Sequence, residues 1–102
     1  MSHPNLPLIL SPQAEEDFAD ILQYTLETWG EAQVYAYREV LDKTLQTIQE
    51  NPYIGSNRPE LSSQHLIFPA GEHLIIYQVS DIAVTVSRIL YRGMDIGQHL
   101  KN

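Results

Sequence analysis

Mostly apolar residues recur at helical spacing in two stretches of the first half of the chain. In residues 12–29 they are Ala14, Phe18, Ile21, Leu22, Thr25 and Trp29, and in residues 31–49 they are Tyr37, Val40, Leu41, Thr44, Leu45 and Ile48. Each set falls on one face of an α-helix. Because only Gly30 separates them, the two helices are predicted to form a hairpin whose apolar stripes need a flat layer to cover them.

The ends of these helices carry the residues that helix termini prefer. Ser11 and Pro12 fit the N-cap and the first position of the first helix, and the carboxylates at residues 15–17 suit the positive end of its dipole. Gly30 is expected to end this helix in a left-handed conformation. Pro52 is expected to stop the second helix by restricting the residue before it, Asn51.

Strand patterns dominate the second half. Apolar runs at residues 66–68 and 74–79 and an alternating run that starts at Ile82 predict three strands, with tight turns at residues 70–71 and 80–81. The polar residues 52–63 are expected to form a loop. Before the first helix, alternation of leucines over residues 6–10 predicts one more short strand, which Pro7 confines to a sheet edge.

The predicted order is β-α-α-β-β-β, in a single domain over residues 1–102. Helices and strands that are segregated along the chain are typical of an α+β fold, here a helical hairpin packed on a mainly antiparallel sheet. In the closing strand, alternation assigns Ile82, Val84 and Val86 to one face and Ala83, Thr85 and Ser87 to the other. The strand then brings Arg88, Tyr91 and Arg92 to its end.

Composition indicates an ordinary globular domain. A hydrophobic fraction of 43% fits one modest core, and no apolar run reaches the length of a membrane span. The N-terminal residues have no positive region ahead of an unbroken apolar stretch, so a signal peptide is not expected and the cytoplasm is the default compartment. With no cysteine, disulfides and thiolate nucleophiles are excluded.

Charge is distributed unevenly. The chain has a formal charge of −7, and residues 1–50 carry nine acidic and two basic residues while the second half is balanced. Affinity for nucleic acid comes mainly from lysine and arginine at phosphates, so direct nucleic-acid binding is not expected. The acidic half is either a solvated face or a surface that meets a basic partner.

The only grouping suited to phosphate chemistry is Arg58, Arg88 and Tyr91, with Arg92 nearby in sequence. Arginine stabilises developing negative charge and tyrosine can move a proton. A nuclease normally also needs a group that titrates near neutrality, and none lies near these residues in sequence. The alternatives are that Arg88 pairs with an acid while Tyr91 packs at the sheet edge, or that these residues contact a partner.

Other titratable residues give no site. His3, His65, His73 and His99 have no metal-ligand spacing, so no metal or cofactor is expected, and these histidines are expected at or near the surface. His73 is placed opposite about Phe68 across the turn. The acidic residues Glu15, Glu16, Asp17 and Asp20 are expected to form a solvated first helical turn.

Two aromatic residues differ in their expected places. Trp29 falls on the apolar stripe and is expected in the core, with an interface role as the alternative, since indole is favoured in binding hot spots. Tyr35 falls off the stripe of the second helix and is therefore the better candidate for an exposed contact.

Four segments in order resemble the ParE branch of the RelE/ParE superfamily, the toxins of bacterial type II toxin–antitoxin modules. They are LSPQAEEDFADILQYTLETWG (residues 10–30), ENPYIGSNRPEL (50–61), PAGEHLIIYQV (69–79) and RILYRGMD (88–95). The resemblance covers nearly the whole chain. It implies a helical hairpin on a twisted antiparallel sheet, and a cognate antitoxin whose disordered segment folds on the toxin in a hetero-oligomer.

The resemblance also implies a target. The ParE branch is associated with poisoning DNA gyrase, whereas the RelE branch cleaves mRNA on the ribosome. This chain has Leu66 and Tyr91 where family members usually carry arginine and histidine, which weakens a nuclease reading. We therefore expect a non-enzymatic gyrase inhibitor; the alternatives are a ribosome-dependent mRNA endonuclease that uses Arg58, Arg88 and Tyr91, and a degenerate, non-toxic binding module.

Candidate contact residues follow from these readings. For the target they are Arg88, Tyr91, Arg92, Met94 and Asp95 in the closing segment. For the antitoxin they are Trp29, Tyr35, Leu8 and Leu10, because a short edge strand accepts another strand and the side of a helical hairpin accepts a helix.

Overall fold

A computed structural model describes residues 6–59 and 62–94 of the chain. Its elements are β1 (Leu8–Leu10), α1 (Pro12–Trp29), α2 (Glu31–Glu50), a 3₁₀ turn η1 (Pro52–Ile54), β2 (Ser56–Arg58), β3 (Ser62–Ala70), β4 (His73–Val79) and β5 (Val84–Tyr91). The predicted α+β order β-α-α-β-β-β is confirmed, with the short strand β2 added. No helix in the described part of the chain is long and apolar enough to cross a membrane.

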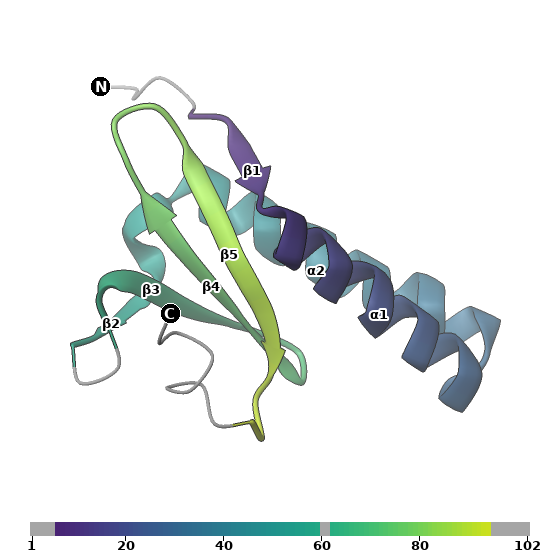
Figure 1. The fold of residues 1–102 in the computed structure, drawn as a ribbon. Helices are drawn as coiled ribbons and strands as arrows, with labels where there is room; N and C mark the ends of the chain where they lie inside the picture. Colours follow the sequence, from purple (N-terminus) through teal and green to yellow (C-terminus); the bar gives the residue numbers. More distant parts are fainter. Residues whose placement is uncertain (1–5, 60–61, 95–102) are drawn as a thin grey trace.

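The five strands form one sheet of order β1-β5-β4-β3-β2. β1 pairs with β5 in parallel, and every other pair is antiparallel. β1 therefore lies at a sheet edge, as Pro7 predicted, and β2 forms the other edge. The helices α1 and α2 run side by side behind the sheet, and the end of their hairpin extends past the strands (Figure 1).

The core lies between the helices and the sheet. It joins the helix residues Ala14, Ile21, Leu41, Leu45 and Ile48 to the strand residues Ala70, Ile75, Tyr77, Val84, Val86 and Ile89. A second, smaller cluster of Ile67, Leu74, Ile76 and Leu90 comes from the alternate positions of β3, β4 and β5. β3, β4 and β5 thus bury residues on both of their faces, which is why residues 74–77 read as a continuous apolar run.

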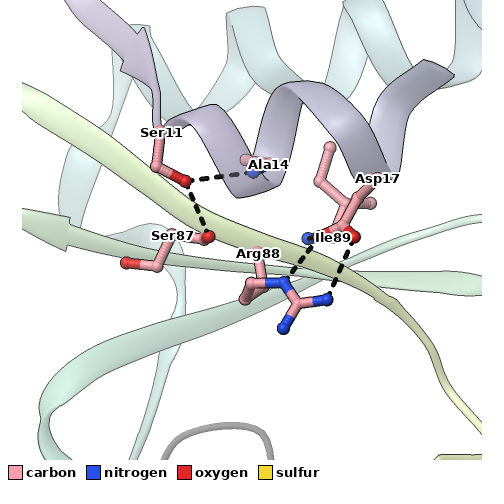
Figure 2. Close-up of polar contacts among 6 residues, drawn as sticks. All are labelled: Ser11, Ala14, Asp17, Ser87, Arg88 and Ile89. Atoms are coloured by element: carbon pink, nitrogen blue, oxygen red, sulfur yellow. Dashed lines mark hydrogen bonds and ion pairs between the residues drawn. The ribbon is translucent and has the colours of Figure 1, made fainter. Parts of the chain in front are cut away.

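Ser11 joins the start of α1 to the sheet. Its hydroxyl accepts the N–H of Ala14 at 3.0 Å, as an N-cap does, and donates to the carbonyl of Ser87 at 2.9 Å. Its own N–H donates to the carbonyl of Val86 at 2.9 Å. Figure 2 shows both hydroxyl contacts. The predicted cap is confirmed, and the same residue continues the pairing of β5 beyond the last residue of β1.

The expectation of a loop over residues 52–63 is wrong in part. Pro52–Ile54 form η1 and Ser56–Arg58 pair with β3, which begins at Ser62 and not at Leu66. The buried Tyr77 organises this segment, because its hydroxyl donates to the carbonyl of Pro52 at 2.7 Å and accepts the N–H of Gly55 at 2.9 Å. The polar composition of this segment predicted a loop, because its partners, β3 and the Tyr77 hydroxyl, lie elsewhere in the sequence.

The closing strand departs from strict alternation. β5 begins at Val84, so the strand start predicted at Ile82 is wrong by two residues, and Ile82 lies before the strand with 78% of its surface exposed. A register shift lets Ile76 pair with Arg88 and Tyr77 pair with Val86. Ser87 is the extra residue of this β-bulge, and residues after it change faces relative to the predicted pattern.

The helical stripes are confirmed except at two positions. Trp29 is 70% exposed at the end of α1, so core packing is wrong for this residue, and Val40 is also exposed. Both residues lie on the predicted stripe. Trp29 is the last residue of α1, and none of the described residues covers most of its indole. Gly30 has φ +93 and ψ 176, a region open to glycine alone, although it is not the left-handed helical conformation predicted.

The β3–β4 turn also needs its glycine. Gly71 has φ +60, and a Cβ there would lie 2.8 Å from ring and hydroxyl atoms of Tyr37. The turn residues are Gly71 and Glu72, so His73 pairs with Ala70, and Phe68 pairs with Ile75. The expected placement of His73 opposite Phe68 is therefore wrong by two residues, because Ala70 belongs to the strand.

Candidate functional site

A groove of about 950 Å³ runs between α1 and the end of β5. Its lining combines aromatic, apolar and charged side chains from both helices, the β3–β4 turn and the closing strand. They are Asp17, Asp20, Ile21, Tyr24, Thr25, Trp29, Gln33, Tyr37, Glu72, His73, Arg88, Ile89, Leu90, Tyr91 and Met94. The groove therefore joins the candidate target residues of β5 to one candidate antitoxin residue, Trp29.

One end of the groove is held by Asp17 and Arg88. The guanidinium donates to both carboxylate oxygens, from Nε at 2.8 Å and from Nη2 at 3.1 Å, and the Ile89 N–H donates to the same carboxylate at 2.9 Å (Figure 2). The two side chains are only 23% and 15% exposed. Hydrogen bonding to Asp17 raises the pKa of Arg88, so the guanidinium stays charged.

Beyond the end of β1, the backbone edge of β5 forms hydrogen bonds with side chains at the start of α1. The Ser11 hydroxyl donates to the Ser87 carbonyl, and the Asp17 carboxylate accepts the N–H of Ile89. This arrangement confirms the alternative that Arg88 pairs with an acid. It also corrects the view of the first helical turn as wholly solvated, because Asp17 faces the sheet while Glu15, Glu16 and Asp20 are exposed.

A second polar cluster lies under the groove and contains Tyr37, His73 and Tyr91. The Tyr37 hydroxyl is 2.6 Å from His73 Nδ1, accepts the N–H of Glu72 at 2.9 Å and is 3.2 Å from the Ala70 carbonyl. The His73 ring meets Tyr37 and Tyr91 edge to face, with centroids 5.5 and 5.9 Å apart.

The hydrogen bonds define the protonation of this cluster. A tyrosine hydroxyl has one proton and can accept two bonds. All three contacts of Tyr37 are satisfied when it donates to Ala70 and accepts from both Glu72 and His73, which puts the His73 proton on Nδ1. Burial is the main cause that lowers the pKa of His73, against the nearby charges of Glu72 and Asp17, which raise it.

We predict a pH-dependent stability that rests in part on His73. The pKa of His73 is lower in the folded chain than in the unfolded chain, so the unfolded chain binds the proton first as the pH falls. The stability present above pH 6.5 is therefore lost as the pH falls from 6.5 to the lower pKa of the folded chain. One such group contributes a slope of at most about 1.4 kcal/mol per pH unit. Urea unfolding between pH 7.5 and 5.5 is expected to show a shallower loss for His73→Gln than for the natural chain.

His65 supplies the comparison for this prediction. Burial also lowers the pKa of His65, so His65→Gln should remove a separate part of the stability loss at low pH. The double variant should show the smallest change of stability between pH 7.5 and 5.5. Equal slopes for the natural chain and His73→Gln would contradict the assigned protonation of the Tyr37–His73 pair.

The candidate nuclease residues do not lie together. Arg58 is on the edge strand β2, three strands from β5, and pairs with Ser62 at the end of β3 remote from the β3–β4 turn. Arg88 and Tyr91 lie on β5, where Tyr91 is the cross-strand partner of His73 at that turn. Adjacent strands are about 4.8 Å apart, so one substrate phosphate does not reach both places.

The other target candidates lie around the end of β5. Tyr91 and Met94 are exposed and line the groove, and the Met94 N–H donates to the Tyr91 carbonyl at 3.0 Å. Arg92 lies beside the β3–β4 turn, with its Nη1 3.2 Å from the carbonyl of Gly71. Asp95 lies outside the described residues.

The antitoxin candidates fall in two places. Trp29 and Tyr35 are 70% and 68% exposed near the end of the hairpin, as expected for Tyr35. Leu8 and Leu10 are part of β1 and pack against the main core, so their side chains already have partners. Among the described residues, no group of three metal-ligating side chains could hold a metal ion.

Sequence reasoning missed the contributions of Asp17, Tyr37 and His73. Tyr37 was placed on the helical stripe and His73 at the start of a strand, but their contact depends on how the helix sits on the sheet. The signal available in the sequence was the glycine at position 71, where any side chain would clash with Tyr37. No group that titrates near neutrality lies near Tyr91 in sequence, as stated above, but the fold brings the His73 ring beside it.

A helical hairpin on one face of this five-stranded sheet defines a RelE/ParE-like toxin fold. A structure titled as a chromosomal ParDE toxin–antitoxin system from P. aeruginosa matches with a TM-score of 0.74 at 13% identity, covering 85% of this chain and 96% of that one. The YoeB dimer from Staphylococcus aureus matches with a TM-score of 0.61 at 20% identity, covering 87% and 99%.

Sequence comparisons identify the branch. The family model described as the ParE toxin of the type II toxin–antitoxin system parDE matches residues 8–96. The chain is 31% identical over 94 residues to Toxin ParE1 of Caulobacter vibrioides, covering 92% of this chain and 97% of that protein. It is 29% identical over 93 residues to Toxin ParE1 of Mycobacterium tuberculosis, covering 90% and 95%. The chain belongs to the ParE toxin family of type II toxin–antitoxin systems.

Proposed function

We propose that this toxin inhibits DNA gyrase and is neutralised by a cognate antitoxin in a cytoplasmic hetero-oligomer. The observation that carries the proposal is the groove, which places exposed aromatic side chains from α1 and β5 around one hollow. Large exposed aromatic residues gathered on a small domain are typical of a protein-binding surface. Family membership supports gyrase as the target and an antitoxin as the second partner.

The target-binding surface is assigned to the end of β5. Tyr91 and Met94 are exposed there, and Arg92 adds a cation beside them. Asp95 continues the same segment in sequence. Because its charge is paired with Asp17, Arg88 has the role of fixing β5 against α1 so that these neighbours are presented in one geometry.

The antitoxin-binding surface is assigned to the hairpin and to β1. Trp29 and Tyr35 offer exposed aromatic area, and β1, with Leu8 and Leu10 packed inward, presents a backbone edge. An added strand and an amphipathic helix are the two ordinary ways in which a folding segment uses such surfaces. The acidic first half of the chain argues against direct nucleic-acid binding by this toxin.

An mRNA endonuclease is the second candidate, and one observation favours it. His73 lies beside Tyr91, so an imidazole that could exchange a proton is present at the candidate site, with its pKa lowered by burial. Against it, Arg58 lies at the opposite sheet edge and Asp17 already engages Arg88. The arrangement therefore supplies no free arginine pair around Tyr91, and we favour binding over catalysis.

Induced expression without antitoxin tests the proposed function. We expect growth arrest with loss of negative supercoiling in a reporter plasmid and intact mRNA. Tyr91→Ala with Met94→Ala should weaken the arrest by at least about tenfold in inducer requirement, since truncating exposed aromatic anchors removes much of a binding surface. Tyr53→Ala removes a tyrosine that is more exposed than Tyr91 and lies outside the groove lining, and it should arrest growth as the natural chain does.

The same cultures separate the alternatives. Arrest with cut mRNA and normal supercoiling would establish the endonuclease and overturn the gyrase proposal. Harmless expression of folded protein would identify a degenerate binding module.

A further inference from the structure

The groove has a wall of aromatic, apolar and acidic residues from α1, in which Asp20 and Tyr24, one turn apart, share a face of the helix. Asp20, Tyr24 and Trp29 follow one another along the helix and all line the groove, with Ile21 behind them. Tyr24 is 65% exposed and Trp29 is 70% exposed, although both lie beside a hollow that could have been closed by the molecule's own side chains. Open ring faces beside a hollow favour an inserted side chain of a partner.

The groove also has an unbalanced negative charge. Of its four charged lining residues, Asp17 and Arg88 neutralise each other. The remaining two, Asp20 and Glu72, are exposed, and within residues 6–59 and 62–94 neither has an ion-pair partner. Residues 1–50, which include both helices and these two aspartates, carry a net charge of −7. Arg92 lies beside Glu72 at the β3–β4 turn, so the negative charge of the groove without a nearby cation is that of Asp20, beside the exposed ring of Tyr24.

We propose that the groove binds a lysine or arginine side chain from the antitoxin, seated over Tyr24 with its charge toward Asp20. This inference rests on the proposed function and names the chemistry of the partner segment. A basic side chain matches both features, because its methylenes pack on ring surface and its cation is attracted to ring faces and to carboxylates.

A second copy of this chain fits the groove less well. Docking two copies through this wall would bring two acidic hairpins together, and like charges at an interface disfavour association. An acidic or purely apolar segment would leave the Asp20 carboxylate unpaired next to buried ring surface. The charge of the groove thus selects a basic partner segment.

The experiment measures the affinity of the purified toxin for the product of the antitoxin gene that neighbours its own, at 50 and 300 mM salt. Asp20→Asn should weaken binding by about tenfold and reduce the salt dependence, since it removes a charge pair while keeping the side-chain shape. Glu27→Gln is the matched control, because Glu27 lies exposed on the same helix outside the groove lining. It should bind within about twofold of the natural chain.

Charge reversal identifies the partner residue. Asp20→Lys should abolish detectable binding, and replacing one antitoxin lysine or arginine by glutamate should restore it only in that combination. Equal affinities and salt dependences for Asp20→Asn and Glu27→Gln would overturn the inference while leaving the antitoxin proposal standing. Failure of the natural chain to bind the antitoxin would instead overturn the proposed function, and a toxin dimer that Asp20→Asn dissociates would assign the groove to a second copy.

Discussion

Asp17→Ala is expected to lower the free energy of unfolding by about 3 kcal/mol. The substitution leaves the Arg88 guanidinium largely shielded from water without its partner, and it leaves the Ile89 N–H without an acceptor. A charge stranded in this way costs more than the net worth of the pair, because its desolvation is no longer compensated. Urea denaturation of the purified variant measures the loss directly.

The double variant separates the pair from its surroundings. Asp17→Ala combined with Arg88→Ala should be no less stable than Asp17→Ala alone, since the unpaired charge is then gone. Asp20→Asn, an exposed carboxylate one turn along α1, should stay within about 0.5 kcal/mol of the natural chain. A loss for Asp17→Ala as small as that of Asp20→Asn would show that the pair does not hold β5 to α1.

Tyr77→Phe is expected to cost about 2 kcal/mol, although it removes one oxygen atom only. Tyr77 is fully buried, and its hydroxyl is the partner of both the Pro52 carbonyl and the Gly55 N–H. Without it, both backbone groups lose their hydrogen bonds and the segment from η1 to β2 loses its anchor on the sheet. Hydrogen exchange at the Gly55 amide should accelerate in proportion to the measured loss of stability.

Two further variants test this anchor. Tyr53→Phe removes the hydroxyl of an exposed tyrosine in η1 and should leave stability unchanged within about 0.5 kcal/mol. Gly55→Ala should destabilise the fold although Tyr77 itself is unchanged, because the new Cβ would lie 2.6 Å from the Tyr77 hydroxyl and displace it. Unchanged protection of the Gly55 amide in Tyr77→Phe would contradict the anchoring role.

The helices could be predicted from the sequence because their signals are local. The spacing of Ile21 and Leu41 in their stripes and the cap at Ser11 depend only on residues within a few turns. Strand β2 could not be predicted in the same way, since its three exposed residues carry no pattern and pair only because β3 lies beside them. The bulge at Ser87 likewise arises from pairing with β4, which alternation along one strand does not report.

The candidate site was predictable in part for the same reason. Tyr91 and Met94 follow the closing strand and lie at its end, as the chain order requires. The neighbours that give them a chemical setting, Asp17 and His73, are 74 and 18 residues from Tyr91 in sequence, and only the packed fold brings them close. The exposure of Trp29 was mispredicted because its helical position matches the stripe but the sheet ends before it.

Charge patterning carried information that spacing did not. The acidic first half argued against nucleic-acid binding, and it left open a basic partner or a solvated face. In the structure, Asp20 lines the groove beside open aromatic rings, whereas Glu27 on the same helix lies outside it. We therefore propose a basic partner for the groove face of α1, while the exposed Glu27 fits the reading of a solvated face.

Inhibition of purified DNA gyrase is the measurement that tests the central proposal most directly. Gyrase would be titrated with the toxin, and supercoiling of relaxed plasmid and accumulation of cleaved DNA would be followed together. The proposal predicts that supercoiling fails and cleaved DNA accumulates, that added antitoxin reverses both effects, and that Tyr91→Ala with Met94→Ala loses them. Normal supercoiling at a large excess of folded toxin would contradict gyrase as the target.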